Sequence, residues 1–190
     1  MKIGLFGYGS LVLPESASMT LGRPAGELRP IRLHDWRRRF SQRRDNLTCE
    51  KTFECAGGWR PEWILGLNVE EGEDGAGPVN GVVIELTEAE LDRLDIREIR
   101  YDRVDVTRSV EGEDLPGRIV TYTAKPFHFA PQPPEEAVIL RTYAEAVEKG
   151  FEALGPDELD HYRATTPYPV ERVEAELVID KIPDGNPRAW

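Results

Sequence analysis

Short apolar runs, each followed by turn-forming residues, divide the first two thirds of the chain into predicted strands. Such runs cover residues 2–8, 63–69 and 81–86. Residues 101–110 instead alternate apolar and charged positions, which is typical of a strand with one exposed face. After a turn, residues 118–124 predict a returning strand.

Helical patterns occupy mainly the last third of the chain. Thr87 and Glu90 have the spacing of a capping box and predict a short helix that ends near residue 95. Residues 138–154 repeat apolar positions at helical spacing, and 156–164 predict a second short helix beyond Gly155-Pro156. The apolar face of the longer helix is predicted to hold Leu140, Tyr143, Ala144, Val147 and Phe151.

The order of these elements indicates the fold class. Strands come first and helices later, which favours an α+β arrangement over alternating βαβ units. Residues 173–179 fit either a strand or a helical turn. With 190 residues and 39% hydrophobic residues, the chain is long enough for one globular domain with its own core.

Charge and cysteine usage narrow the classes of partner. The formal net charge of -11 disfavours general binding to nucleic acid or to anionic membranes. The mixed aromatic and basic stretch Trp36-Arg37-Arg38-Arg39-Phe40 is therefore interpreted as an edge strand with one basic face. Two cysteines make no disulfide framework, and no apolar run approaches the roughly 20 residues of a membrane span. We expect a soluble, cytoplasmic protein.

The first predicted strand ends in a glycine-rich turn, Gly7-Tyr8-Gly9-Ser10-Leu11. Together with Gly4, these glycines have the spacing G-x-x-G-x-G, the reverse of the dinucleotide-binding order. Ser10 directly follows a glycine and lacks the G-x-S-x-G context of a nucleophilic serine. Successive backbone N–H groups in such a turn can bind one anion, such as a substrate carboxylate. Taken alone, the pattern fits a purely structural turn at least as well.

A carboxylate stands at the junction between the predicted helix near residue 95 and the strand that follows. Glu98 is flanked by Arg97, Arg100 and Arg103, and Tyr101 follows three residues later. Junctions of this kind point side chains into clefts. On spacing alone, a solvated run of ion pairs is the more common explanation.

No pattern of metal ligands is present in the sequence. His34, His128 and His161 lie far apart, and Cys49 and Cys55 have five residues between them and no matching pair. We expect no metal site.

Four stretches, taken in order, resemble the γ-glutamylcyclotransferase superfamily, which includes the ChaC-like glutathione-degrading enzymes. They are FGYGSL at 6–11, DWRRRF at 35–40, GVV at 81–83 and the segment 91–101. The resemblance extends over roughly residues 3–125, and between 41 and 60 the chain departs from the ChaC pattern. Glutathione is therefore not implied as the particular substrate.

The resemblance implies a fold and a division of the chain. The fold is α+β, a small mixed, mostly antiparallel β-barrel with peripheral helices. Residues 1–125 are expected to form this barrel core, and 126–190 a C-terminal helical extension packed on the same domain.

The resemblance also implies the site. Glu98 corresponds to the family's catalytic carboxylate, and the turn after the first strand is implied to hold the γ-glutamyl head group. Backbone N–H groups of that turn would bind the substrate α-carboxylate, and one of two tyrosines would hydrogen-bond the head group. The predicted binding residues are Tyr8, Gly9, Ser10, Leu11 and Tyr101.

The implied reaction cyclises a γ-glutamyl amide to 5-oxoproline and releases an amine or amino acid. One carboxylate can act first as base and then as acid, so no metal, cofactor or enzyme nucleophile is required. A γ-glutamylamine cyclotransferase, or an enzyme that removes a γ-glutamyl protecting group, fits the same residues. A non-catalytic module that binds a small ligand is the alternative of a different class, because a fold does not determine a function. The leaving amine and the oligomeric state stay open.

Overall fold

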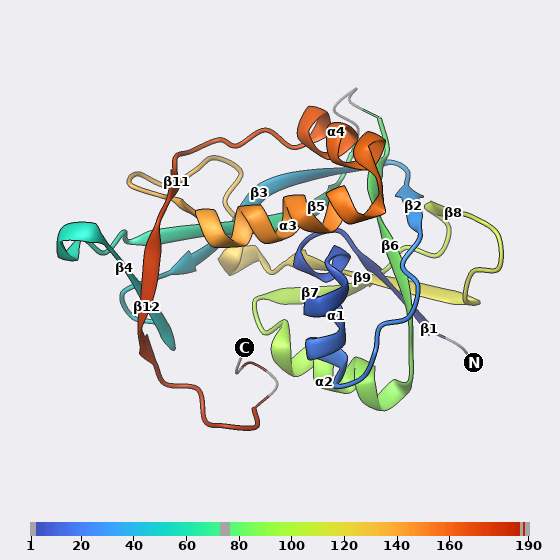
Figure 1. Cartoon of the computed structure of the whole chain (residues 1–190), viewed down its shortest axis with the longest axis horizontal. Coiled ribbons are helices and arrows are strands. Elements are labelled where there is room, and N and C mark those ends of the chain that lie inside the picture. Colours follow the sequence, from blue (N-terminus) through green and yellow to red (C-terminus); the bar gives the residue numbers. More distant parts are fainter. Residues whose placement is uncertain (1–2, 73–76, 187, 189–190) are drawn as a thin grey trace.

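The computed structural model describes residues 3–72, 77–186 and 188, so Lys2 of the first predicted strand lies outside the described part. A six-stranded sheet with the order β7-β9-β1-β6-β2-β8 forms its centre (Figure 1). Only β1 and β9 pair in parallel; the other neighbours are antiparallel. The strands of this sheet are β1 (Ile3–Gly7), β2 (Pro30–Leu33), β6 (Val79–Leu86), β7 (Tyr101–Asp105), β8 (Val110–Glu111) and β9 (Arg118–Ala124).

A long antiparallel ribbon, β3 (Trp36–Asp45) with β5 (Trp63–Glu71), packs against this sheet. Side chains join the two layers: the Tyr101 hydroxyl of β7 donates to the Leu67 carbonyl of β5 at 2.8 Å. The backbone N–H of Ala124 in β9 donates to Oδ1 of Asn68 in β5 at 2.7 Å. The sheet is thereby curled and mostly antiparallel, and the predicted α+β, barrel-like fold class is confirmed.

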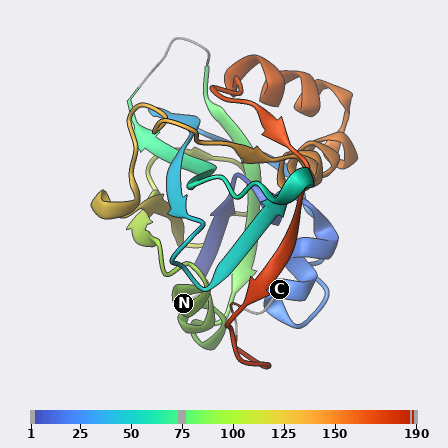
Figure 2. The same ribbon diagram turned by 90° about the vertical axis from the view of Figure 1, so that its left-hand side faces the viewer.

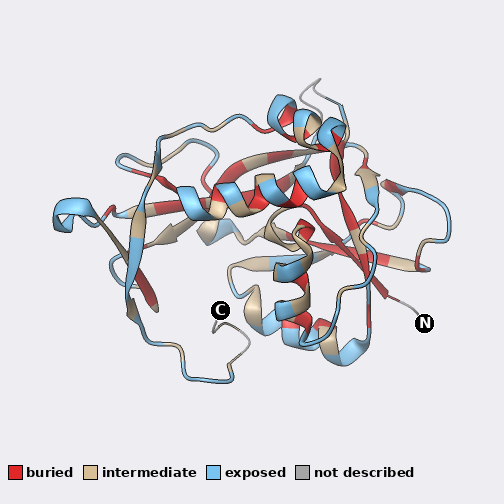
Figure 3. Ribbon diagram, in the orientation of Figure 1, coloured by how far each residue is buried: buried red, intermediate tan, exposed pale blue. Residues whose placement is uncertain are grey.

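Two shorter pairs of strands complete the β-structure. β4 (Lys51–Cys55) pairs with β12 (Ala175–Asp180), and β10 (Ile139–Leu140) pairs with β11 (Arg172–Val173). The segment 173–179, which the sequence left open, therefore contains strand. The part after residue 125 holds β10, β11 and β12 as well as helices, and its separation from the barrel core stays a prediction. Residues 139–140, predicted as the beginning of a helix, form strand β10 instead. Most of β12 is exposed, whereas β1 is buried along its whole length (Figure 3).

The helices are α1 (Pro14–Leu21), α2 (Glu88–Arg97), α3 (Arg141–Leu154) and α4 (Pro156–Thr165), with 3-10 turns η1 (Ser10–Val12), η2 (Ala56–Gly58) and η3 (Pro126–His128). α1, α3 and α4 lie on the same side of the sheet (Figure 2). The predicted capping box is present, since the Thr87 hydroxyl accepts from the Glu90 N–H and the Glu90 carboxylate accepts from the Thr87 N–H. α1 and β4 have no counterpart among the predicted segments. Within the described ranges, no helix is long and apolar enough to cross a bilayer.

α3 packs tightly on the segment that follows β1. Its buried face holds Ala144, Val147, Gly150 and Phe151. A Cβ atom at Gly150 would lie 2.7 Å from the backbone nitrogen of Leu13 and 2.9 Å from the carbonyl carbon of Val12. Only glycine permits this approach, which brings the C-terminal half of α3 against Val12 and Leu13, directly after the turn that follows β1.

Replacing Gly150 with alanine should lower the free energy of unfolding by about 1–3 kcal/mol, the usual cost of overpacking. The clash is with backbone and outweighs the roughly 1 kcal/mol by which alanine is favoured over glycine in helices. Urea denaturation measures the change. Lys149→Ala, on the exposed side of the same turn, is the matched control and should stay within about 0.5 kcal/mol. A Gly150→Ala protein as stable as the control would contradict the packing argument.

Candidate active site

The turn after β1 presents a row of backbone N–H groups. η1 begins directly after Gly9, and its later amides are used within the turn, because the Val12 N–H donates to the Gly9 carbonyl at 3.0 Å. The N–H groups of Gly9, Ser10 and Leu11 find no acceptor among residues 3–72, 77–186 and 188. The first N–H groups of any helix lack partners within it. These three amides are the ones that the sequence predicted to bind an anion.

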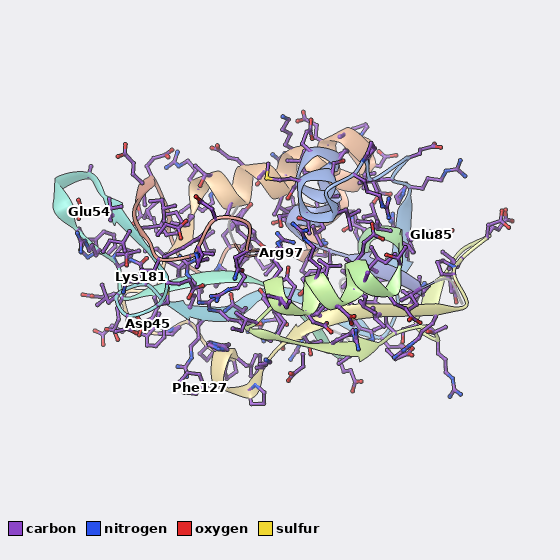
Figure 4. The ribbon with its side chains drawn as sticks, turned by 90° about the horizontal axis from the view of Figure 1, so that it is seen from below. Asp45, Glu54, Glu85, Arg97, Phe127 and Lys181 are labelled. Atoms are coloured by element: carbon purple, nitrogen blue, oxygen red, sulfur yellow. The ribbon has the colours of Figure 1, made fainter. Side chains whose placement is uncertain are left out.

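Glu98 caps the C-terminal end of α2, and most of its side chain is buried. Its backbone N–H donates to the Leu94 carbonyl at 2.7 Å, and its own carbonyl accepts from the Tyr101 N–H at 2.8 Å. The side chain keeps 20% of its surface exposed, and Arg97 Nη1 lies 3.1 Å from its Oε1. Arg97, labelled in Figure 4, lies near the middle of the molecule, whereas Phe127 lies at its edge.

The environment of Glu98 favours its protonated form. Burial raises the pKa of the Glu98 carboxyl above its ordinary value of 4.5. The cations of Arg97 and Arg100 act in the opposite direction but do not cancel the effect of burial. A glutamate with a raised pKa is suited to exchange a proton with a substrate near neutral pH.

Electrostatic coupling places Glu98 close to the turn after β1. The pKa of the Tyr8 hydroxyl is raised, first by burial, next by Tyr143 and then by the charge of Glu98. Glu98 also contributes to the raised pKa values of Tyr101 and Tyr143, in which burial is again the main cause. Because such coupling weakens with distance, the three tyrosines and the carboxylate share one region.

The hydroxyl protons of the two predicted binding tyrosines are already engaged. Tyr8 donates to the Tyr122 carbonyl at 2.7 Å, and Tyr101 donates to the Leu67 carbonyl at 2.8 Å. Each oxygen can still accept a hydrogen bond, so these tyrosines suit a ligand ammonium group better than a ligand oxygen.

Tyr143 is a site residue that the sequence did not reveal. Its hydroxyl accepts weakly from the Leu67 N–H at 3.4 Å, and its own proton has no acceptor in the described part of the chain. A Cβ atom on Gly9 would lie only 3.2 Å from this hydroxyl, so the turn and α3 meet here. The helical pattern had indicated Tyr143 only as a packing residue on the apolar face of α3.

Arg38 is a second residue that the sequence did not reveal. It is 1% exposed, and its guanidinium donates to the Tyr8 carbonyl at 3.1 Å and to the Asn80 carbonyl and Oδ1, both at 2.7 Å. Its Nε donates to the Thr166 hydroxyl at 2.9 Å. The charged group lies 4.8 and 4.6 Å from the ring centres of Phe151 and Tyr162, which stack on each other. Through its hydrogen bond to the Tyr8 carbonyl, Arg38 holds the turn after β1 in place from the buried side of β3.

The prediction for the stretch 36–40 is partly wrong. Arg37 and Arg39 lie on the outer side of the ribbon and pair with Glu70 at 3.2 and 3.5 Å. Arg38 alternates to the opposite face, with Trp36 and Phe40, and is buried there. Side chains of a strand alternate between its two faces, so the position of Arg38 between Trp36 and Phe40 could have indicated that it shares their buried face.

Two surface clefts in the structure lie away from Glu98 and the turn after β1. One surface cleft of about 380 Å³ is lined by Glu148 and Arg163, and another of about 560 Å³ by residues 105–109 and 117–118. Across the ranges that the structure describes, no three His, Cys, Asp or Glu side chains are grouped to hold a metal ion.

Comparison with known proteins gives both a family and a fold. The family model for gamma-glutamyl cyclotransferase, AIG2-like proteins matches residues 5–143. No curated protein matches the chain. A solved gamma-glutamyl cyclotransferase has a TM-score of 0.61 at 16% identity, with 90% of this chain and 91% of that chain covered.

Two further solved structures have the same fold. A Homo sapiens protein described as uncharacterized has a TM-score of 0.62 at 16% identity, covering 92% of this chain and 94% of its own. YkqA from Bacillus subtilis has a TM-score of 0.56 at 18% identity, covering 84% of this chain and 52% of its own. At such identities the structures establish the fold and not the substrate.

Proposed function

We propose that this chain, which belongs to the gamma-glutamyl cyclotransferase, AIG2-like family, cyclises a γ-glutamyl amide to 5-oxoproline and releases the attached amine. The observation that supports the proposal best is the pairing of Glu98, whose pKa burial raises, with the unpartnered amides of the turn after β1. The two groups match the two needs of such a substrate, a proton carrier and an anchor for its α-carboxylate.

The substrate carries its own nucleophile, so the protein has only to position it and move a proton. The α-amine nitrogen attacks the γ-carbonyl carbon, and Glu98 takes a proton from that nitrogen. Glu98 then returns the proton to the departing nitrogen as the amide C–N bond breaks. The products are 5-oxoproline and a neutral amine, and no water is consumed. Positioning contributes strongly, because an intramolecular attack needs a near-attack conformation.

The residues around Glu98 and the turn after β1 offer hydrogen-bonding partners for the carboxylate, the amine and the carbonyl of the γ-glutamyl unit. Amides of Gly9, Ser10 and Leu11 would hold the α-carboxylate. The oxygens of Tyr8 and Tyr101, whose protons are engaged, would accept from the N–H groups of the neutral α-amine.

The γ-carbonyl would find its donor in the hydroxyl of Tyr143. The proton of this hydroxyl has no acceptor in the described ranges. Hydrogen bonds to the oxygen that gains negative charge stabilise the transition state of acyl transfer.

The experiment that tests the proposal is incubation of the purified protein with glutathione and a panel of γ-glutamyl amino acids and amines. We expect 5-oxoproline, detected chromatographically, from at least one substrate, with the rate unchanged by a metal chelator. Calorimetric binding of these compounds without any 5-oxoproline would overturn the proposal in favour of a ligand-binding module.

The decrease of kcat/KM at low pH should reflect the protonation of Glu98. Because the base must be ionised and burial raises its pKa, kcat/KM should fall on acidification with an inflection above 4.5. Arg97→Met removes a cation that lowers this pKa, so the inflection should move to higher pH.

The same measurement contains its own control. Titration of the substrate amine is identical for both proteins, so any difference between their profiles belongs to the enzyme. An inflection that stays in place or moves down in Arg97→Met would contradict the assignment of Glu98 as the base.

A further inference from the structure

Arg44, near the end of β3, carries a buried guanidinium without hydrogen-bonding partners. Its Nε and Nη2 atoms are both buried and find no acceptor. The side chain lies with its charge 5.0 Å from the ring centre of Phe53, and the residue as a whole is half-buried. Leaving a buried charged donor unpaired costs more than leaving a neutral one, so such a group calls for an explanation.

The strand register places Arg44 on the face of the ribbon that Tyr101 contacts. Gln42 pairs with Gly66 and Arg44 pairs with Ile64, and residues directly opposite in a pair share a face. A Cβ atom on Gly66 would lie 2.8 Å from Gln42 Oε1 and 3.4 Å from the Tyr101 hydroxyl, so Tyr101 lies on this face. Arg44, two residues beyond Gln42, projects to the same side.

Arg100 connects this position with Glu98. It is the neighbouring cation that lowers the pKa of Arg44, after burial as the main cause, and it also lowers the pKa of Glu98. Arg100 therefore lies near both groups.

The charges around Arg44 leave an excess of positive charge. Glu50 is already bound by Arg100 at 2.6 Å and by Arg188 at 2.5 Å, and these hydrogen bonds hold its pKa at about 2 despite burial. Glu98 is paired with Arg97. Three arginines, Arg44, Arg100 and Arg188, thus lie around the one carboxylate of Glu50, and Arg44 is the one that makes no hydrogen bond to it or to another acceptor in the described residues.

We propose that Arg44 binds a carboxylate on the leaving amine of the substrate. In a γ-glutamyl amide the α-carboxylate and the leaving nitrogen lie at opposite ends of the reacting unit. When the first is held by the turn after β1 and the second receives its proton from Glu98, the substituent of the amine extends toward Arg44. The substrate class is then a γ-glutamyl amino acid or peptide, and not a γ-glutamyl derivative of a neutral or cationic amine. This inference rests on the proposed function.

The test compares substrates that differ only in this carboxylate. γ-Glutamyl-alanine is compared with γ-glutamyl-alaninamide, in which a neutral amide replaces the carboxylate. A charge-assisted hydrogen bond should favour the acid by about 10–100-fold in kcat/KM, mainly through KM. In Arg44→Met the ratio should fall toward one, while turnover of the alaninamide stays within about threefold of wild type.

Arg43→Met is the matched control. Arg43 lies next in the strand on the opposite face, where it stacks on Trp63 and donates to the Phe127 carbonyl. This variant should keep the wild-type preference. Arg44→Met should also unfold at the same temperature as wild type or higher, because it removes an unpaired buried charge. A large loss of stability would indicate a structural role instead.

Binding measured on the Glu98→Gln protein separates this inference from the proposed function. In one outcome, wild type cyclises neither compound, but calorimetry shows that the acid binds more tightly than the amide and that Arg44→Met abolishes this difference. The carboxylate site is then supported, and the cyclotransferase proposal is wrong. If wild type cyclises both compounds equally, or if Arg44→Met keeps the preference, the carboxylate site is wrong and the proposed function survives.

Discussion

Replacing Glu98 with glutamine should lower the rate of cyclisation by about 10²–10⁴-fold, the usual contribution of a general acid–base group. Glutamine keeps the size of the side chain but can neither take nor return the proton. Since the head group is held by other residues, KM should change little. Turnover is measured as 5-oxoproline formed from a substrate that the wild-type protein cyclises.

Glu88→Gln is the matched control for this loss. Glu88 is the first residue of the same helix, is exposed, and lies at the end of α2 away from the site. Its neutralisation should leave turnover unchanged. Near-normal turnover by Glu98→Gln would remove Glu98 from the mechanism.

The same substitution should not destabilise the protein at neutral pH. The pKa of Glu98 is raised in the folded state, so its contribution to stability is full below the unfolded value of 4.5 and is lost as the pH rises through the folded pKa. Glutamine never ionises. The variant should therefore unfold at a higher temperature than wild type at pH 7.5, and the difference should vanish below about pH 4.5. A catalytic carboxylate held at a cost in stability has this signature.

Replacing Arg38 with methionine should have the largest effect on stability, a loss of about 3–5 kcal/mol, because several buried acceptors lose their donor and each one left unsatisfied costs about 1–3 kcal/mol. The substitution leaves the carbonyls of Tyr8 and Asn80 and the Thr166 hydroxyl without their donor. At neutral pH the group is charged, because burial lowers its pKa only to about 10. Urea denaturation at pH 7 measures the change.

The neighbouring Arg39 provides the control for Arg38. Arg39 keeps 34% of its side-chain surface exposed and pairs with Glu70 on the outside of the ribbon. Arg39→Met should cost no more than about 1 kcal/mol, as for other exposed ion pairs. Arg38→Lys keeps the charge but not the planar fork, so its stability should lie between wild type and Arg38→Met. Equal stability of Arg38→Met and Arg39→Met would contradict the role assigned to Arg38.

Local patterns predicted most of the secondary structure. The apolar run that became β1, the alternation in β7 and the spacing that became α3 each reflect how side chains of one element face a core. The capping box at Thr87 was predicted because its hydrogen bonds join residues three apart. α1 and β4 were missed, since their short segments carry no clear period and are set by packing against other elements.

The candidate site was predicted only in part. The glycine turn and Glu98 were singled out because both lie at junctions that local patterns can locate. Tyr143 and Arg38 were not, although Tyr143 is on a predicted helix and Arg38 is on a predicted strand. The role of Tyr143 depends on Gly9, which is 134 residues away in sequence, and the role of Arg38 depends on Tyr8, which is 30 residues away. No local pattern carries that information.

Local sequence patterns were enough to predict the order and type of the main elements, the α+β class and the two segments that hold the glycine turn and Glu98. These features depend on periodicity, turn propensity and capping, which act over a few residues. Which of the many charged side chains are buried beside Glu98 depends instead on contacts between distant segments of the chain. Burial and electrostatic coupling arise where the turn after β1, β5, β7 and α3 meet in space. Depending on such contacts, the same type of residue is a solvated surface charge or a buried cation.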